Sequence, residues 1–126
     1  MTKKEIAQAE AVKTLKEWGI KDGTTIYAKV VRVSSSGMSR HVRLYANIKG
    51  EVVDISYHAA KALEWGYAGD RYNEGIRVSG CGMDMLFHTV YSLSYAMGYG
   101  ALDQTHSKED RNINKEGYYG LKYRQL

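Results

Sequence analysis

Apolar residues recur at helical spacing in two long stretches of the chain, which predicts two amphipathic helices. The first is expected over residues 3–18, because Thr2 and Glu5 have the spacing of a capping box and Gly19 supplies a C-terminal stop. The second is expected over residues 83–97. The predicted core stripe of the first helix comprises Ile6, Ala9, Val12, Leu15 and Trp18. That of the second comprises Leu86, Val90, Leu93 and Met97, with Met83 and Phe87 beside it.

Other segments show the features of β-strands. Residues 24–33 are rich in β-branched side chains, and residues 51–55 and 76–78 form shorter runs of the same kind. A strand that begins near Arg40 alternates strictly, which predicts one buried and one solvated face. Its apolar positions are Val42, Leu44, Ala46 and Ile48, and its polar positions are His41, Arg43, Tyr45, Asn47 and Lys49.

These segments predict an α+β fold with the order α-β-β-β-α-β-α and an irregular C-terminal tail. A short helix at residues 57–65, with Ser56 as its N-cap and Gly66 as its stop, follows the third strand. The first three strands are expected to form an antiparallel meander. We therefore expect a single domain over residues 1–126, in which a small antiparallel sheet of about four strands packs with three helices. Residues 66–75 are expected to form a flexible loop, and residues 100–126 a loosely structured tail.

Composition narrows the class of protein. The chain has 126 residues, a net charge of +4 and a pI of about 9.1, which argues against a carboxylate-rich mimic of DNA. Its single cysteine cannot form an internal disulfide, and neither a signal peptide nor a membrane-spanning stretch is apparent. We therefore expect a cytoplasmic protein with no membrane partner. The 11 tyrosines favour a binding surface, although tyrosines at the edge of the core are the simpler explanation.

The first candidate site lies where Cys81, flanked by glycines, precedes a helix. Exposed N–H groups at a helix start favour a thiolate, but Asp84 opposes a second negative charge there. His88 lies seven residues on, about 10.5 Å along the axis, so a base for the thiol would have to be His41 or His58. The simpler alternative is a structural cysteine at a tight turn, with Asp84 capping the helix and contacting His88. We expect Cys81 to be mainly structural.

The second candidate is the 34–40 loop, which offers Ser36, Ser39 and Arg40 as ligands for an anion. Successive N–H groups in such a turn can form a nest, and an arginine can bind phosphate or carboxylate with two hydrogen bonds. The spacing is not that of a P-loop, and an ordinary hairpin loop is the alternative. This loop and the start of the 83–97 helix are expected to lie close together.

The third candidate is the basic hairpin that contains this loop. It has five basic residues and no acidic one between Gly23 and Gly50, and Arg43, Tyr45 and Lys49 are the candidates for contact with nucleic acid or another partner. A solvated strand face is an equally good explanation. The chain has no C-x-x-C and no H-x-x-x-H, so we expect no metal and no cofactor.

Three segments carry a resemblance to a known family. They are S-S-S-G-M-S-R at 34–40, D-I-S at 54–56 and G-I-R-V-S-G-C-G-M-D-M-L-F-H at 75–88, and together they resemble a family of small accessory proteins encoded mostly in bacteriophage genomes. The similarity covers about residues 25–98. It implies expression in the cytoplasm of a bacterial host, where such proteins often bind and inhibit host machinery, including CRISPR or restriction systems.

Three functions follow from these patterns. The leading expectation is a phage accessory protein that binds and modulates a host or phage macromolecule, with a protein partner favoured and an anti-defence role implied by the resemblance. The second is a small enzyme that uses Cys81, Asp84 or His88 on a ligand held by the 34–40 loop. The third is a weak nucleic-acid-binding protein that uses the basic hairpin. The sequence leaves an enzymatic activity undecided and favours its absence.

Overall fold

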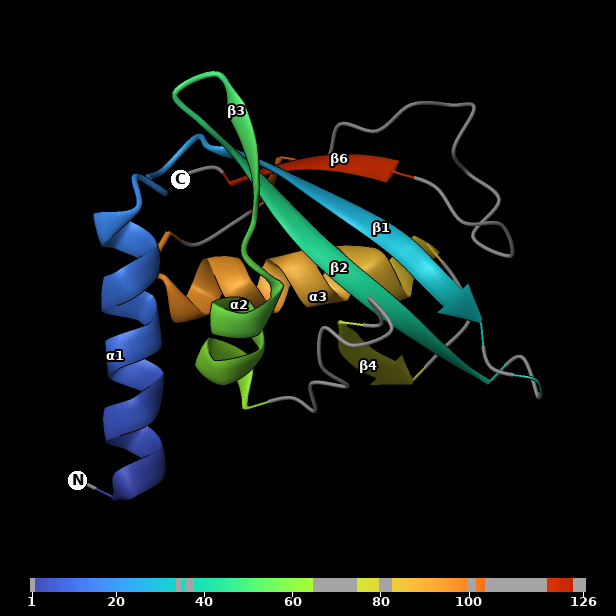
Figure 1. Cartoon of the computed structure of the whole chain (residues 1–126), viewed down its shortest axis with the longest axis horizontal. Coiled ribbons are helices and arrows are strands. Elements are labelled where there is room, and N and C mark those ends of the chain that lie inside the picture. Colours follow the sequence, from blue (N-terminus) through green and yellow to red (C-terminus); the bar gives the residue numbers. More distant parts are fainter. Residues whose placement is uncertain are drawn as a thin grey trace.

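The computed structural model describes residues 2–33, 35, 38–64, 75–79, 83–99, 102–103 and 118–123. Three helices and six strands lie in these ranges, and they confirm the α+β class with an antiparallel sheet (Figure 1). The helices are α1 (Lys3–Glu17), α2 (Ser56–Leu63) and α3 (Met83–Ala96). The strands are β1 (Thr25–Val33), β2 (Ser39–Ile48), β3 (Glu51–Asp54), β4 (Ile76–Ser79), β5 (Leu102–Asp103) and β6 (Tyr118–Tyr123). Within these ranges no helix combines the length and the apolar character needed to cross a bilayer.

The sheet has the order β3-β2-β1-β6-β5, and β4 pairs with β2 beside this path. The antiparallel meander of β1, β2 and β3 is as predicted. The tail is a correction, because β6 pairs with β1 along residues 25–29 and β5 pairs with β6. Residues 118–123 are too short a run to predict a strand, and they find their pairing partners in β1 and β5, far away in the sequence. The sheet therefore has two more strands than the four expected.

The hydrophobic core lies between one face of the sheet and the helices. Val42, Leu44 and Ala46 of β2 and Ile26 and Ala28 of β1 share this face, since their register places them side by side. Figure 1 shows α3 crossing behind β1 and β2, and α1 standing beside α2 at one end of the sheet. The core residues of the helices include Ala11, Leu15, Ala59, Ala60, Val90, Leu93 and Met97. Burial of these side chains is the main favourable term for folding.

The two predicted core stripes differ in outcome. Val90, Leu93 and Met97 of α3 are buried as predicted, whereas the side chains of Met83, Leu86 and Phe87 lie outside the described residues. The α1 stripe is largely wrong, because Ile6, Ala9 and Trp18 are exposed and Val12 is only half-buried, which leaves Leu15 as its one fully buried member. Helix α1 contacts α2 and buries Ala11 and Leu15, so the buried face is narrower than the periodic pattern suggests.

Helix α2 departs from its predicted boundaries. It begins at Ser56 and ends at Leu63, and Glu64 ends it in the left-handed conformation with φ of 58°. The predicted stop, Gly66, lies outside the described residues. Ser56 is not a side-chain cap, because its hydroxyl is used by a neighbouring strand. The boundary shifts because the tertiary contact of Ser56 competes with its local role as a cap.

Strand β2 has one long edge that two strands share. β3 pairs with its residues 45–48 and β4 with its residues 39–42, so the edge is interrupted at Arg43 and Leu44. The chain returns to this edge at Gly75, which has φ of 69°. A Cβ atom there would lie 2.5 Å from the carbonyl oxygen of Val42 and 2.8 Å from Cγ of Arg43. Only glycine therefore fits this approach without displacing backbone.

We predict that Gly75→Ala destabilises the protein by about 3 kcal/mol, because the left-handed φ and the overlap with β2 both oppose a side chain. Gly50→Ala is the matched control, since Gly50 also has a positive φ, 85°, but a Cβ atom at this position would meet nothing within 4 Å. The control should cost only about 1 kcal/mol. Denaturant unfolding of both variants measures the difference, and equal costs would contradict the close approach.

Candidate functional site

The three segments that carry the resemblance converge on β2. The end of the 34–40 segment pairs with β4, with Ser39 opposite Ser79 and Arg40 opposite Val78. Helix α3 begins at Met83, four residues beyond Ser79, so the end of the loop pairs with the strand that precedes α3. Most of the loop and residues 80–82 lie outside the described residues, so the closeness of the loop and the start of α3 stays a prediction. The 54–56 segment lies next to the interruption between β3 and β4. Segments far apart in sequence therefore meet along one strand edge.

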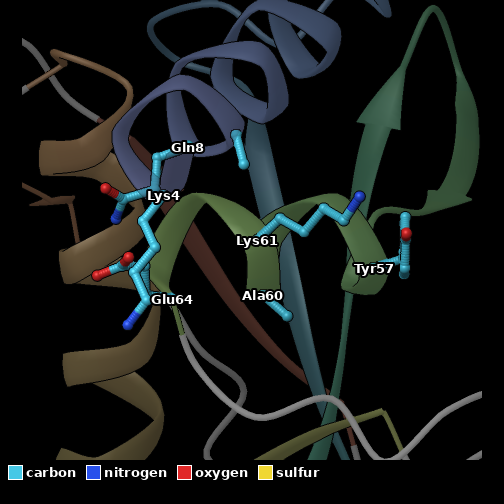
Figure 2. Close-up of a pocket in the computed structure, with 7 residues that line it drawn as sticks. Lys4, Gln8, Tyr57, Ala60, Lys61 and Glu64 are labelled. Carbon is cyan, nitrogen blue, oxygen red and sulfur yellow. The ribbon is translucent and has the colours of Figure 1, made fainter. Parts of the chain in front are cut away.

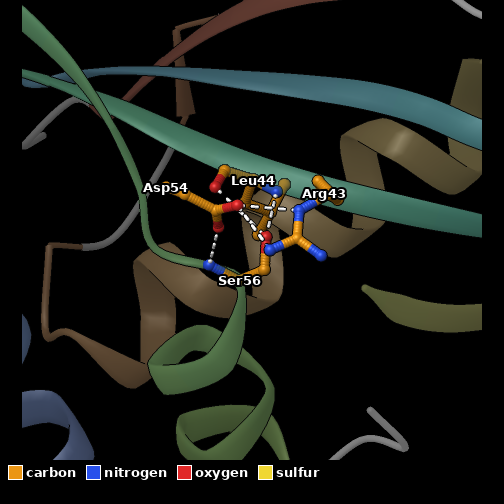
Figure 3. A network of polar contacts seen from close by, with 4 residues as sticks. All are labelled: Arg43, Leu44, Asp54 and Ser56. Atoms are coloured by element: carbon orange, nitrogen blue, oxygen red, sulfur yellow. Dashed lines mark hydrogen bonds and ion pairs between the residues drawn. The ribbon is translucent and has the colours of Figure 1, made fainter. Parts of the chain in front are cut away.

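A polar network fills the interruption in the edge (Figure 3). The guanidinium of Arg43 forms an ion pair with Asp54, with Nε donating to Oδ2 at 2.7 Å. The other carboxylate oxygen, Oδ1, accepts the N–H of Ser56 at 2.8 Å. The Ser56 hydroxyl accepts the N–H of Leu44 at 2.9 Å and donates to the Leu44 carbonyl at 3.3 Å. The Ile55 N–H donates to the same carbonyl at 2.9 Å. Residues 54–56 thus supply the hydrogen bonds that a continuous neighbouring strand would give Leu44.

This arrangement corrects the predicted solvated face of β2. Residues 40–44 are all buried, including Arg40, His41 and Arg43. Arg43 is covered because its guanidinium lies beside Asp54 and its stem meets the chain at Gly75. Asp54 and Gly75 both lie at the interruption of the edge, and they cover the polar side chain that the alternating pattern assigned to solvent. Tyr45 is half-buried and Lys49 is exposed, so only part of the predicted basic surface is displayed.

Arg40 is only 1% exposed. It lies two residues before Val42 and four before Leu44, on the face of β2 that meets the core. Its NH1 donates to the carbonyl of Ser39 at 3.1 Å. The side chain predicted to reach out of the loop toward an anion is therefore directed to the inside of the domain. Ser39 is half-buried as the first residue of β2.

The remaining candidates are described only in part. Ser36 and Cys81 lie outside the described residues, and so does the side chain of Asp84. His88 is exposed on α3. Among the residues that the structure describes, no group of three or more histidine, cysteine, aspartate or glutamate side chains could hold a metal ion. The predicted contact between Asp84 and His88 involves a side chain outside the described residues, so it stays a prediction.

A groove lies between α1 and α2 (Figure 2). It has a volume of about 510 Å³ and is lined by Lys4, Ala7, Gln8, Tyr57, Ala60, Lys61 and Glu64. Lys4 and Glu64 lie at one end and Tyr57 at the other. The ammonium of Lys61 lies 4.6 Å from the centre of the Tyr57 ring, a cation–π distance. The groove therefore combines an apolar floor with a charged rim.

An aromatic cluster continues from this groove. The His58 ring meets Trp18 edge to face at 4.7 Å, and it meets Tyr57 in the same way at 5.2 Å. Burial of the imidazole, and then the charge of Lys61, lower the pKa of His58 from its ordinary value. We call Trp18, Tyr57, His58 and Lys61 the aromatic surface. The sequence did not reveal this surface, since Trp18 fitted a helical core stripe and His58 was considered as a base for Cys81 and not as part of a binding surface.

A second hollow borders Trp18, whereas the groove between α1 and α2 borders Tyr57. The hollow has a volume of about 500 Å³ and is lined by Trp18, Ile48, Lys49, Glu51 and Val53. The last four residues belong to the hairpin of β2 and β3. The aromatic surface is therefore bounded by a groove between helices on one side and by a hollow beside a strand on the other.

No protein-family model, curated protein or solved structure matches this chain. The geometry of the described residues therefore carries the argument for function.

We predict that Asp54→Asn destabilises the protein by about 2 kcal/mol. Removing one partner of a buried ion pair costs about 3–5 kcal/mol, and the 35% exposure of the Asp54 side chain reduces this value. The Asp54→Asn, Arg43→Met double variant should lose less than the sum of the single variants, because no buried charge is then left alone. Denaturant unfolding of all four proteins measures the coupling, and additive losses would show that the ion pair contributes nothing.

We predict that the stabilising effect of a neutral His58 weakens under mild acid. Its pKa is lowered in the folded state, so the unfolded state binds the proton more readily below the ordinary value of about 6.5. The contribution is fully present above that pH and is lost as the pH falls through the folded pKa. The stability difference between the native protein and His58→Gln should therefore shrink between pH 8 and pH 5. In Lys61→Met, an NMR titration should show the His58 pKa rising toward its ordinary value.

Proposed function

We propose that this chain binds another protein through the aromatic surface and has no enzymatic activity of its own. The observation that carries the proposal is the exposure of two large aromatic rings, Trp18 at 38% and Tyr57 at 46%, between two hollows. Tryptophan and tyrosine are enriched at interfaces, where they supply a large rigid contact area and most of the binding energy. A cation held over Tyr57 adds a polar rim.

The distribution of basic side chains supports a protein partner over nucleic acid. Binding to nucleic acid depends on cations that reach phosphates and displace their counterions. Arg40 and Arg43 are buried, and Arg43 is neutralised by Asp54. A net charge of only +4, spread over the chain, adds little further attraction. We therefore rank nucleic-acid binding by the hairpin below binding to a protein.

The resemblance to phage accessory proteins gives the proposal a context. A protein of this kind acts in the cytoplasm of an infected bacterium, where its target is a host or phage macromolecule. An anti-defence inhibitor can act by imitating DNA or by covering a protein surface. The positive net charge opposes the first route, and the aromatic surface suits the second. We propose an inhibitor or modulator of the second kind.

The test is affinity purification of the tagged chain from phage-infected bacteria, with both protein and nucleic acid identified in the bound fraction. We expect one protein to be recovered at a fixed ratio and to resist nuclease treatment. The Trp18→Ser, Tyr57→Ser double variant should lose this protein by at least tenfold, because it removes both anchors. Tyr95→Ser is the matched control, since Tyr95 is exposed at 56% but lines neither hollow.

Three results would contradict the proposal. In one, recovery of the protein depends on nucleic acid and ends with nuclease treatment. In another, the double variant binds as well as the native chain while Tyr95→Ser does not. In the third, no protein is recovered at a fixed ratio. Circular dichroism and thermal melting of each variant ensure that a loss of binding is not a loss of folding.

A further inference from the structure

Strand β3 is the last strand on its side of the sheet. Among the described residues it pairs only with β2, and Figure 1 shows the hairpin of β2 and β3 projecting beyond α2. Val52, in the middle of β3, is 58% exposed, the second-largest value among the exposed large hydrophobic side chains that the structure describes. An exposed edge strand presents a row of backbone groups to which another strand can bind.

The turn before β3 decides which of its backbone groups face outward. Lys49 and Gly50 both have positive φ, 52° and 85°, as in a two-residue type I′ turn. Ile48 and Glu51 close this turn as a hydrogen-bonded pair, and the pairs of an antiparallel ladder then alternate. Asn47 and Val52 form the next, non-hydrogen-bonded pair. The N–H and C=O of Val52 therefore point away from β2, toward the open edge.

The side chains of β3 supply a second element of recognition. Glu51 and Val53 lie two residues apart, on the face that meets the hollow beside Trp18. In a strand added to the open edge, the residue opposite Val53 would lie on this face and next to the hollow. The residue opposite Glu51 would lie on the same face, within reach of an exposed carboxylate.

We infer that β3 accepts an extended segment of the partner protein as an additional antiparallel strand. This inference rests on the proposed function and specifies how the partner binds. The segment has a bulky apolar residue opposite Val53, any residue opposite Val52 and a basic residue opposite Glu51. In an antiparallel strand these three residues follow one another in that order. The apolar side chain enters the hollow lined by Trp18 and Ile48, and the basic one pairs with Glu51.

Charge argues for a different protein over a second copy of this chain. Two β3 strands that paired edge to edge about Val52 would bring both Glu51 carboxylates to diagonal positions on one face, where they repel each other. The Arg43 guanidinium is already paired with Asp54 and therefore offers no compensation. A strand with a basic residue at the same place is attracted instead. Exposed charge on an edge strand is a known means of preventing self-association.

The test uses the purified full chain and two synthetic peptides, Ser-Thr-Leu-Val-Arg-Thr-Ser and the same sequence with Glu in place of Arg. We expect the Arg peptide to bind and to shift the amide NMR signals of Val52 and Asp54. Val52→Pro should weaken binding about fivefold, because it removes an outward N–H. Proline is tolerated at such an edge position, so the fold should be kept. Val52→Thr, which keeps the N–H and the β-branched shape, is its control.

Charge exchange tests the side-chain contact independently. Glu51→Lys should prefer the Glu peptide about threefold, while the native chain prefers the Arg peptide to a similar extent. Equal binding of both peptides by both proteins would refute the Glu51 contact. Strand addition itself is overturned by any of three results. These are no binding at millimolar peptide, NMR shifts confined to the groove between α1 and α2, and a dimer of the native chain that Val52→Pro abolishes.

The failure of this inference can be told apart from failure of the proposed function. If the partner protein is lost by the Trp18→Ser, Tyr57→Ser variant but bound normally by Val52→Pro, the aromatic surface binds it without an added strand. If the Arg peptide binds as described and no protein partner is recovered from infected bacteria, the edge is a binding site and the proposed function is wrong.

Discussion

The closure of the β2 edge by Arg43, Asp54 and Ser56 is the constraint on which the rest of the structure depends. One edge of β2 pairs with two strands, β3 and β4. At the interruption between them, the N–H and C=O of Leu44 would have no partners without residues 54–56. A buried backbone group left in this way costs about 1–3 kcal/mol. The hydroxyl of Ser56 accepts the Leu44 N–H, and the Ile55 N–H together with the same hydroxyl donates to the Leu44 carbonyl. Asp54 holds Ser56 in place while it compensates the buried charge of Arg43.

The same network fixes the position of the aromatic surface. Because Ser56 is both the partner of Leu44 and the first residue of α2, the helix starts at a defined point on the sheet. Tyr57 and His58 follow at once, and His58 meets Trp18 at the end of α1. The buried faces of α1 and α2 pack together below them. A weakened network would therefore alter the surface as well as the core. A loss of partner binding in an Asp54 variant could then come from altered folding, so these variants are used to test stability and not partner contact.

The structure also separates two roles that charge and aromatic content suggest. The arginines of β2 are internal and serve the architecture, whereas the exposed rings of the aromatic surface, Trp18 and Tyr57, lie at the end of α1 and on α2. The proposed binding surface thus includes only the end of the basic hairpin, where Ile48 and Lys49 line the hollow beside Trp18. It combines a rigid aromatic patch with an open strand edge, and the two adjoin at the hollow beside Trp18. An extended segment bound at the edge would lie against this patch, which joins backbone pairing with side-chain anchoring.

Local patterns determined most of the elements. The capping residue Thr2, the stripe of Val90, Leu93 and Met97, and the alternation after Arg40 are signals that act within a few residues. Together with the other local patterns, they predict the presence of three helices, the meander and the α+β class. The same local signals failed where a distant group decided the outcome. Residues 118–123 form a strand because they pair with the edge of β1. The Ser56 hydroxyl accepts the Leu44 N–H and is therefore not used to cap α2.

The candidate sites show the same division. The sequence identified the 34–40 and 75–88 segments as related, and the β2–β4 register brings their ends together. It could not show that Arg40 faces the core or that Arg43 is paired with Asp54, because burial of a strand position depends on what covers both faces and both edges. It also could not show that Trp18 is exposed, since a helical stripe gives periodicity but not the width of the contact. The sequence by itself determined the helices and strands that have strong local patterns, and it named candidate residues for a site. Only the tertiary structure decided which of those residues reach the surface, because that depends on the packing of segments far apart in the chain.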